Sequence, residues 1–240
     1  MSKNIDVYTT GLSLSEDDVR GKTVIVVDVL RASSTIITAL TNNAKSVIPV
    51  ADMGEASKIA QNLDPSGCLL CGERDGKQIE GYALGNSPSE YTNDVVEGKT
   101  LILTTTNGTR AISRSSLASK VIVAGFLNAA AVAESVKDDD SEIIIVCAGW
   151  KGRLSLEDVL CAGYIVSAYY DGNLPDEAKD GAKVAVGLYD RYKDTILDTV
   201  SVTNHAKRLV EMGYGDDIAY CCQLNKFQFV PVVDEGIIQI

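Results

Sequence analysis

Apolar runs rich in β-branched residues recur along the chain, and segments with helical periodicity separate many of them. The eight candidate strands are residues 23–27, 46–50, 67–71, 100–103, 120–124, 142–147, 183–186 and 227–233. Most of these runs lack polar alternation, which is typical of strands covered on both faces. Strands that alternate with helices predict an α/β fold with three layers, α/β/α, around a mixed and largely parallel sheet.

Three features of the sequence bear on how the chain is organised: its C-terminal stretch, one polar segment and two similar segments. The C-terminal apolar stretch, residues 227–240, is followed by no helix, so we expect it to add an antiparallel edge to the sheet. Residues 1–240 are treated as one domain, and the polar segment 170–180, broken by Gly172 and Pro175, is the candidate lobe boundary. "VIVVDVLRASST" and "IIIVCAGWKGRLSLEDV" share one order of strand, loop with a cation, hydroxyl and helix, so two similar halves are weighed as an option.

Two helix starts carry the pattern of a capping box. They are Ser87-Pro88-Ser89-Glu90 and Ser155-Leu156-Glu157-Asp158. In such a box the first hydroxyl accepts a backbone N–H and the acid three residues later reaches back. Both segments are therefore predicted to begin helices.

The charge balance limits the partners of this chain. The 240 residues contain 22 Lys and Arg against 33 Asp and Glu, a formal net charge of −11. Such a surface repels nucleic acid and anionic lipid, so we expect neither as a partner. A small anionic ligand could bind only where positive charge is gathered locally. A homodimer is expected only from the frequency of such dimers among soluble proteins.

The N-terminal and cysteine patterns indicate a cytoplasmic protein. "MSKNIDVYTTGLS" lacks the basic-then-apolar layout of a signal peptide, and no apolar run reaches the ~18 residues of a membrane span. The six cysteines are then expected to stay reduced. Cys68 and Cys71 lie in an apolar strand-like segment, and side chains three apart on a strand point to opposite faces. We interpret them as buried thiols.

The end of the first long apolar run combines a carboxylate, a cation and hydroxyls. Asp28 closes the run, Arg31 follows, and Ser33, Ser34 and Thr35 begin a helical segment. Ligands of open α/β sheets bind at the carboxyl ends of strands, where helix N-termini favour anions. This segment is therefore a candidate wall of a phosphate site. The alternative is that Ser33 is a plain N-cap and that Arg31 pairs with Asp28.

Three further loops follow predicted strands and carry similar residues. They are "GERDGKQIEGYALGNS" (72–87), "TTTNGTR" (104–110) and "GWKGRLSLED" (149–158). The alternatives are a surface hairpin around Asp75-Gly76, a hydroxyl-rich turn at 104–107, and acids at 157 and 158 that merely suit the helix dipole. Each of the four loops carries at least one Lys or Arg, although the chain is strongly acidic. The joint pattern predicts an inward-facing basic pocket for a multiply anionic ligand.

The carboxylates in these loops would oppose that charge unless a cation lay among them. Mg²⁺ binds through one or two carboxylates plus substrate phosphate oxygens. The candidate metal ligands are Asp28, Glu73 and Asp158. A magnesium-assisted phosphoryl site accommodates both signs of charge.

Other chemistries have little support. The single histidine, His205, shares a helical face with Leu209 and Met212, so it is interpreted as structural or surface. One histidine excludes histidine-rich zinc sites, and no nucleophile elbow supports a Ser-His-Asp triad. Neither a G-x-G-x-x-G nor a P-loop spacing is present, which disfavours a kinase. Trp150 is equally consistent with a pocket wall and with core packing.

Four motifs together carry a resemblance to a known family. "VDVLRASSTIITAL", "GERDGKQIEGYALGNSPSEY", "TTTNGTRAI" and "AGWKGRLSLEDVLCAG", in this order, resemble the 2-phosphosulfolactate phosphatases. The resemblance covers residues 24–163, with weaker likeness towards the C-terminus. It implies a magnesium-dependent phosphatase on an unusual α/β/α fold. It also implies cleavage of (2R)-2-phospho-3-sulfolactate to 3-sulfolactate and phosphate, in coenzyme M biosynthesis.

This substrate would carry three anionic groups, and different loops would each bind one of them. We expect one group on Arg31 with the two serines after it, another on the loop at 106–110, and the third on Lys151 and Arg153. The candidate catalytic residues are Asp28, Arg31, Glu73 and Arg74. The candidate substrate-binding residues are Ser33, Ser34, Thr105, Thr106, Asn107, Gly108, Thr109, Arg110, Lys151 and Arg153.

Two alternatives stay open from the sequence. Magnesium on Asp28 would activate a water, whereas a phospho-aspartyl intermediate at Asp28 is the competing route. The chief rival function is a non-catalytic binding protein for an anionic metabolite that uses the same helix ends.

Overall fold

The strands and helices account for most of the chain, and their order matches the alternation seen in the sequence. The structure is a computed structural model that describes residues 4–240, without the side chain of Ser13. The strands are β1 (Ile5–Tyr8), β2 (Thr23–Val27), β3 (Ser46–Pro49), β4 (Cys68–Arg74), β5 (Lys77–Gln78), β6 (Thr100–Thr104), β7 (Lys120–Ala124), β8 (Ile143–Cys147), β9 (Val232–Asp234) and β10 (Ile237–Gln239). The helices are α1 (Glu16–Val19), α2 (Ala32–Thr41), α3 (Met53–Ala60), α4 (Asn93–Val96), α5 (Gly108–Arg114), α6 (Ala129–Ser135), α7 (Leu156–Tyr169), α8 (Asp180–Tyr192), α9 (Ile196–Ser201), α10 (Asn204–Glu211) and α11 (Gly215–Cys221). Short 3₁₀ segments are η1 (Gly11–Ser13), η2 (Pro88–Glu90), η3 (Phe126–Asn128) and η4 (Lys193–Thr195).

Within residues 4–240, ten strands form one sheet in the order β1-β8-β2-β7-β9-β10-β3-β6-β4-β5. The strands β1, β8, β2 and β7 form one parallel set, and β3, β6 and β4 form another. The hairpin β9–β10 lies between the two sets and pairs antiparallel with both. The predicted three-layer α/β/α architecture with a mixed, largely parallel sheet is therefore confirmed.

The C-terminal hairpin joins the two sets instead of forming an edge. Val233 pairs with Val121 of β7, and Ile238 pairs with Val47 of β3. The prediction of an antiparallel addition is confirmed, but its place at the edge is wrong. At this junction, one side of β7 and one side of β3 have no parallel neighbour among the described strands. The hairpin pairs with both, β9 with β7 and β10 with β3.

Three successive antiparallel pairings make the second set run opposite to the first. In a flat sheet, the carboxyl ends of β2 and β6 would then point to opposite sides. Neighbouring strands rotate by roughly 20–25°, so the five steps from β2 to β6 add up to roughly 100° or more. The sheet is therefore strongly twisted, and its carboxyl ends can approach one another.

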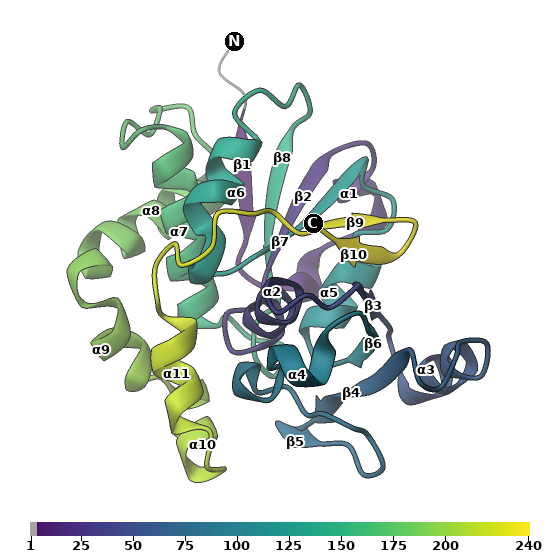
Figure 1. Cartoon of the computed structure of the whole chain (residues 1–240). Helices are drawn as coiled ribbons and strands as arrows, with labels where there is room; N and C mark the ends of the chain where they lie inside the picture. The colour runs from purple at the N-terminus through teal and green to yellow at the C-terminus, as the bar shows by residue number, and fades with distance from the viewer. Residues whose placement is uncertain (1–3) are drawn as a thin grey trace.

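Helices α2 and α5 lie side by side on one face of the sheet (Figure 1). A single core contains Val24 of β2, Leu101 of β6, Ile36 of α2 and Ile112 of α5. Since this core holds side chains from both strand sets, the sheet curls around the α2–α5 pair.

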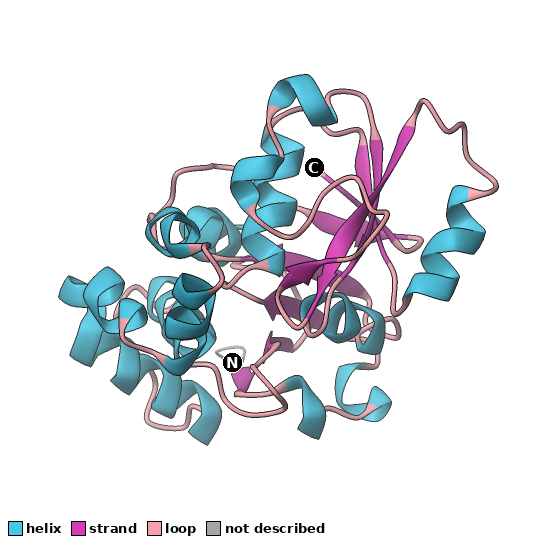
Figure 2. Cartoon of the chain, turned by 90° about the horizontal axis from the view of Figure 1, so that it is seen from below, coloured by secondary structure: helices cyan, strands magenta, loops and turns pink. Residues whose placement is uncertain are grey.

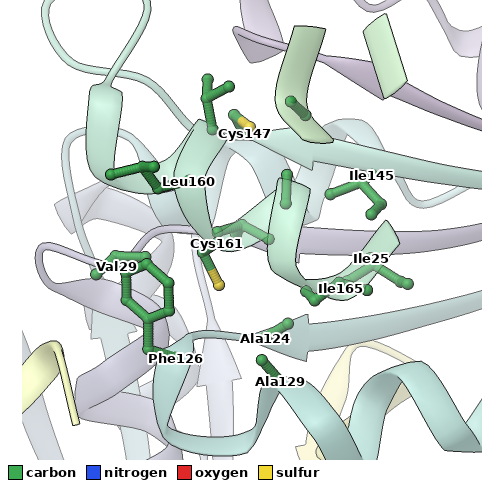
Figure 3. Close-up of a cluster of buried hydrophobic side chains, with 14 of the residues drawn as sticks. Ile25, Val29, Ala124, Phe126, Ala129, Ile145, Cys147, Leu160, Cys161 and Ile165 are labelled. Atoms are coloured by element: carbon green, nitrogen blue, oxygen red, sulfur yellow. The ribbon is translucent and has the colours of Figure 1, made fainter. Parts of the chain in front are cut away.

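The opposite face is covered by other helices (Figure 2). Against the first set, Leu160 and Ile165 of α7 pack on Ile25 and Ile145, with Phe126 closing the cluster (Figure 3). Against the second set, Ala56 of α3 packs on Ile102. The strands are thus buried on both faces, which explains their continuous apolar runs.

Several predicted elements differ from the observed ones. Residues 183–186 lie inside α8, where Ala182, Ala185 and Val186 face the core. A four-residue apolar run cannot distinguish a strand from a turn of helix. Of residues 227–233, only the end becomes β9, and the short strands β1, β5 and β10 were not predicted.

The two sequence segments that suggested a duplication occupy different places. They form β2–α2 and β8–α7, but α2 and α7 belong to the cores on opposite faces of the sheet. The chain after α7 continues as helices, not as a second strand. In the polar segment 170–180, residues 170–179 form the loop between α7 and α8, which pack against each other, and Asp180 begins α8.

Neither predicted capping box is present. Ser87 precedes the 3₁₀ segment η2 and makes no capping bond, and Glu90 accepts a hydrogen bond from Gly85 N instead. Ser155 is the N-cap of α7, also without a side-chain capping bond. Ser87 Oγ donates to Asp217 of α11 instead, and Asp158 accepts from the backbone of Val29 and Gly149.

The interpretation of the cysteines as buried thiols holds for five of the six. All six are free, but Cys68 is only half-buried. Over residues 4–240, every helix is too short or too polar to cross a lipid bilayer.

The contact between α7 and α8 depends on Gly163. A Cβ at Gly163 would lie 2.1 Å from the carbonyl oxygen of Ala185 and 2.7 Å from Cβ of Tyr189. We expect Gly163→Ala to lower the free energy of unfolding by about 1–3 kcal/mol through overpacking. Gly187→Ala is the control, because nothing lies within 4 Å of its added Cβ. The control should stabilise α8 by about 0.5–1 kcal/mol. Urea denaturation of both variants tests this, and equal effects would contradict the packing argument.

Candidate active site

The four loops predicted to carry the chemistry meet around one cavity of about 450 Å³. Residues from all four loops and from α10 line it: Asp28, Leu30, Arg31, Glu73, Asp75, Gly76, Asn86, Thr106, Asn107, Trp150, Lys151, His205, Arg208, Leu209 and Met212. A second cavity of about 280 Å³ shares Thr106, Asn107 and Lys151 with the first. Turns distant in sequence are therefore neighbours in the folded chain.

The start of α5 packs directly on the start of α2. A Cβ at Gly108 would lie 2.6 Å from Oδ2 of Asp28 and 2.6 Å from Cβ of Ala32. Only glycine leaves room for this approach. Gly108 thus contributes space to the site, and it lines neither cavity.

Asp28 is held at this junction by its own loop. Its backbone N–H donates to Oγ of Ser33, and Ala32 N donates to its Oδ1 at 3.3 Å. The other oxygen, Oδ2, lies against Gly108. Burial raises the pKa of the Asp28 carboxyl from 3.8 to about 6, although the nearby His205 and the Ala32 N–H act in the opposite direction. Asp28 thus presents one carboxylate oxygen that is not used by its own loop.

The hydroxyls after Asp28 shape the loop and do not line the cavity. Ser33 accepts from the backbone of Asp28, and Ser34 Oγ donates to the carbonyl oxygen of Val29. Both serines are buried. The helix begins two residues earlier than the interpretation of Ser33 as an N-cap required, because Arg31 occupies the N-cap position.

Asp158 lies behind the cavity as a structural link between two loops. Its Oδ1 accepts from Val29 N at 2.8 Å, and its Oδ2 accepts from Gly149 N at 3.0 Å. Burial, together with Asp28 and Glu157, raises the pKa of its carboxyl well above its ordinary value. Since both oxygens are engaged and the residue lines neither cavity, its side chain is not placed to contact a metal there.

Glu73 clamps two loops at the cavity wall. Its Oε1 accepts from Thr106 N at 2.6 Å, and its Oε2 accepts from Gly76 N and Thr106 Oγ1. Arg74 points away and binds the carbonyl oxygen of Glu73 and Oγ1 of Thr104. Arg74 lines neither cavity, so it supports the strands β4 and β6 below the site.

Arg31 is paired with a residue from α11 and not with Asp28. Its Nη1 contacts Oδ2 of Asp217 at 2.7 Å, and its guanidinium lies 4.0 Å from the ring centroid of Tyr214. Asp217 also accepts from Ser87 Oγ. Arg31 and Asp217 are both almost fully buried, so the ion pair fixes the guanidinium at the cavity wall.

The loop at 104–110 contributes to both cavities. Thr105 and Thr109 bond each other reciprocally, with each backbone N–H donating to the other's hydroxyl at 3.0 Å. Both are buried and line neither cavity, whereas Thr106 and Asn107 line both. Arg110 lines the second cavity, one helical turn before Arg114.

The loop at 149–153 brings one of its two cations to the site. Lys151 lines both cavities, and its Nζ lies 4.6 Å from the ring centroid of Trp150. Arg153 is exposed and lines neither cavity, because Trp150 and Arg153 pair through their backbones across a tight turn. Of the two options left open for Trp150, a pocket wall and core packing, the structure places it on the wall of the first cavity.

Helix α10 supplies a wall that sequence reasoning did not predict. His205, Arg208, Leu209 and Met212 face the cavity. The sequence shows that His205, Leu209 and Met212 share a helical face, which favours a structural or surface role for the histidine, but it does not show that this face borders the cavity. The signal that was available is that this is the chain's one histidine. Nothing in the sequence marked Asp217 as the partner of Arg31.

The charge of the first cavity is balanced. Arg31, Lys151 and Arg208 oppose the carboxylates of Asp28, Glu73 and Asp75. A phosphate dianion would therefore gain little from this lining alone. The second cavity has Arg110, Arg114 and Lys151 and no acidic residue. Positive charge was predicted for one pocket shared by all four loops; it is concentrated in this second cavity, which only the loops at 104–110 and 149–158 among them line.

The donor set of the first cavity fits a hard divalent cation in part. Asp28 offers an oxygen, Glu73 lines the wall, and Oδ1 of the cavity-lining Asn86 is buried with no hydrogen-bond partner in residues 4–240. Carboxylate and amide oxygens are ligands that Mg²⁺ accepts, and it needs only one or two carboxylates when phosphate is present. No group of three His, Cys, Asp or Glu side chains that could hold a metal exists among the described residues. The arrangement suits a metal shared with a substrate, not one held by the protein alone.

Comparison with known proteins gives this site a family. The profile of the family described as 2-phosphosulpholactate phosphatase matches residues 9–236. The chain belongs to this family. It is 42% identical over 236 residues to a probable 2-phosphosulfolactate phosphatase of Caldanaerobacter subterraneus subsp. tengcongensis, which covers 98% of this chain and 97% of that protein.

Other relatives carry the same name. A probable 2-phosphosulfolactate phosphatase of Clostridium acetobutylicum is 41% identical over 232 residues, covering 97% of this chain and 98% of that protein. One of Thermotoga maritima is 42% identical over 216 residues, covering 90% and 91%. The resemblance predicted from the four motifs is confirmed. As a member of the 2-phosphosulpholactate phosphatase family, the chain is a phosphoric monoester hydrolase.

The burial of Asp28 predicts a pH dependence of stability in the metal-free protein. Its pKa is about 6 in the folded chain against 3.8 ordinarily, so the folded state holds the proton more tightly. This contribution is fully present below pH 3.8 and is lost as the pH rises through 6. We expect the wild type to lose roughly 2–3 kcal/mol relative to Asp28→Asn between pH 4 and pH 7. Urea denaturation in EDTA at each pH measures the difference. Parallel curves for the two proteins would contradict the raised pKa.

Proposed function

We propose that this protein is a magnesium-dependent phosphatase that hydrolyses 2-phosphosulfolactate, or a similar 2-phospho-hydroxycarboxylate, to the alcohol and phosphate. The observation that supports this most directly is the position of Asp28. Its carboxylate lies where the starts of α2 and α5 meet, at the wall of a cavity to which all four predicted loops contribute. The relatives named as probable 2-phosphosulfolactate phosphatases suggest the substrate.

The two adjoining cavities suit a substrate with several anionic groups. The phosphate group would occupy the first cavity, next to Asp28 and Asn107. The sulfonate would extend into the second, whose lining contains Arg110 and Arg114 without an opposing acid. Guanidinium groups bind such planar or tetrahedral anions through paired N–H donors. Lys151 lines both cavities and could contact either group.

Magnesium would be held by Asp28, Glu73 and Asn86 together with substrate oxygens. When bound, it would neutralise phosphate charge and activate the attacking water. The balanced charge of the first cavity supports this requirement, because three carboxylates there cancel three cations. Arg31, fixed by Asp217, would orient the phosphate oxygens.

Two rivals of this proposal remain to be separated by experiment. In a phospho-aspartyl route, Asp28 would attack phosphorus itself. In a binding protein, the same cavities would hold the anion without turnover. Coenzyme M biosynthesis, a cytoplasmic location and a homodimer are part of the proposal as expectations from the sequence.

The proposed function is tested by phosphate release from 2-phosphosulfolactate. We expect release with Mg²⁺, none after EDTA treatment, and recovery when Mg²⁺ is restored. Asp28→Asn should lower kcat at least about a hundredfold while the ligand still shifts the melting temperature. Ligand binding without release by the wild type would favour the binding protein. Trapping of phosphate on Asp28 after acid quench would favour the phospho-aspartyl route. Wild-type turnover by Asp28→Asn would remove Asp28 from the chemistry.

Arg110 tests the assignment of the second cavity. We expect Arg110→Ala to raise KM for 2-phosphosulfolactate roughly tenfold with little change in kcat, because a loss of about 1.4 kcal/mol of binding is tenfold. For 2-phospholactate, which lacks the sulfonate, KM should change much less. Lys183→Ala, on the exposed side of α8, is the control. Equal effects on both substrates would place the sulfonate elsewhere.

A further inference from the structure

The single histidine lies in an arrangement that the family assignment does not explain. His205 belongs to α10, and its ring stacks on Trp150 with centroids 5.1 Å apart and planes tilted by 19°. Its Nδ1 lies 2.7 Å from Oε1 of Glu157. The two contacts come from the loop after β8 and from the first turn of α7. The loop at 149–158 and α10 therefore together determine the orientation of this ring.

Glu157 interacts with the histidine through one carboxylate oxygen. It is buried, its Oε1 contacts only the ring nitrogen, and its Oε2 has no hydrogen-bond partner within residues 4–240. A carboxylate at this distance accepts the Nδ1–H, so it selects the tautomer and leaves Nε2 as the other ring nitrogen. The same use of a carboxylate to orient an imidazole occurs in other catalytic sites.

The ring borders the cavity that is proposed to hold the phosphate. His205 lines this cavity with Asp28 on another wall, and the two are close enough for His205 to oppose the raised pKa of Asp28. The other cations of the lining are Arg31, Lys151 and Arg208. Guanidinium groups do not release protons, which excludes Arg31 and Arg208 as proton donors. Lys151 is exposed to solvent, whereas the His205 ring is held in place by Trp150 and Glu157. Imidazole is the side chain suited to exchange protons near neutral pH.

We infer that His205 is a catalytic residue that protonates the leaving oxygen of the substrate, and that Glu157 is the positioning residue for its ring. The inference rests on the proposed phosphatase function. The reaction expels a secondary alkoxide, which is a poor leaving group without a proton. A proton donor on the cavity wall removes this obstacle, and typically contributes about 10²–10⁴-fold to a rate.

In the proposed step, proton transfer from His205 accompanies the cleavage of the phosphate ester. The phosphorus–oxygen bond to the carbon skeleton breaks, and its electron pair stays on the leaving oxygen. The proton on Nε2 moves to that oxygen and gives the free alcohol. A water oxygen forms the new bond to phosphorus; one of its protons stays on the hydrogenphosphate and the other goes to solvent. The neutral imidazole then regains a proton from solvent, so no other reactant is needed.

The decisive experiment compares two leaving groups in the full-length protein with Mg²⁺. His205→Asn keeps a side-chain N–H for Glu157 but removes the exchangeable proton. For 2-phosphosulfolactate we expect kcat to fall by about 10²–10⁴-fold. For p-nitrophenyl phosphate, whose nitrophenolate leaves without a proton, the fall should be less than about tenfold. Lys207→Gln, on the exposed side of the same helix, is the control and should change neither rate.

A second measurement uses the natural leaving group alone. His205→Ala leaves a slot between Trp150 and Glu157, so added imidazole should restore part of the lost activity on 2-phosphosulfolactate. Glu157→Gln should show the same dependence on leaving group as His205→Asn, with a smaller loss. These readouts separate proton donation from a structural role, because loss of a structural role would lower kcat for both substrates equally.

The outcomes distinguish this inference from the proposed function. If the wild type releases no phosphate from either ester, the proposed function itself fails. If the wild type is active and His205→Asn is equally active, His205 is not catalytic. Equal losses on both esters, or no response of His205→Ala to imidazole, would also overturn the inference.

Discussion

The packing of α5 on α2 is the contact on which the rest of the site depends. Both helices belong to one core that includes side chains from both parallel strand sets. Gly108 brings the start of α5 against Asp28, so the loops after β2 and β6 share a cavity although their strands run in opposite directions. Without that apposition, each loop would be an ordinary polar turn at the end of its own strand.

The acidic composition of the chain is compatible with its anionic substrate class because several carboxylates of the site are engaged by protein groups, while cations face the cavities. Asp158 and Glu73 hold backbone groups, and Asp217 holds Arg31. The remaining cations face two adjoining cavities, one balanced and one with positive side chains only. Buried carboxylates here act mainly as fixed acceptors that position loops and cations, which is why so many of them lie close to the two cavities.

The sequence motifs did not distinguish residues that stabilise the loops from residues that reach the cavity. Ser33, Ser34, Thr105 and Thr109 lie in the predicted loops, yet their hydroxyls satisfy backbone groups. A hydroxyl near a helix start serves either purpose with the same residue types. Asp28, Thr106 and Asn107 reach the cavity from the same loops. The side-chain direction that separates the two groups depends on neighbours that are distant in sequence.

The sequence by itself determined the strands of both parallel sets except β1, the four loops at the carboxyl ends of these strands, and the family. These features depend on local hydrophobic patterning and on short motifs, which are readable without knowledge of contacts. Only the tertiary structure decided that the C-terminal hairpin joins the two sets and that α10 and α11 close the site with His205 and Asp217. The reason is physical: pairing between residues 186 positions apart, as in Arg31 and Asp217, leaves no trace in local periodicity. Such pairing is selected by the packing of the whole chain.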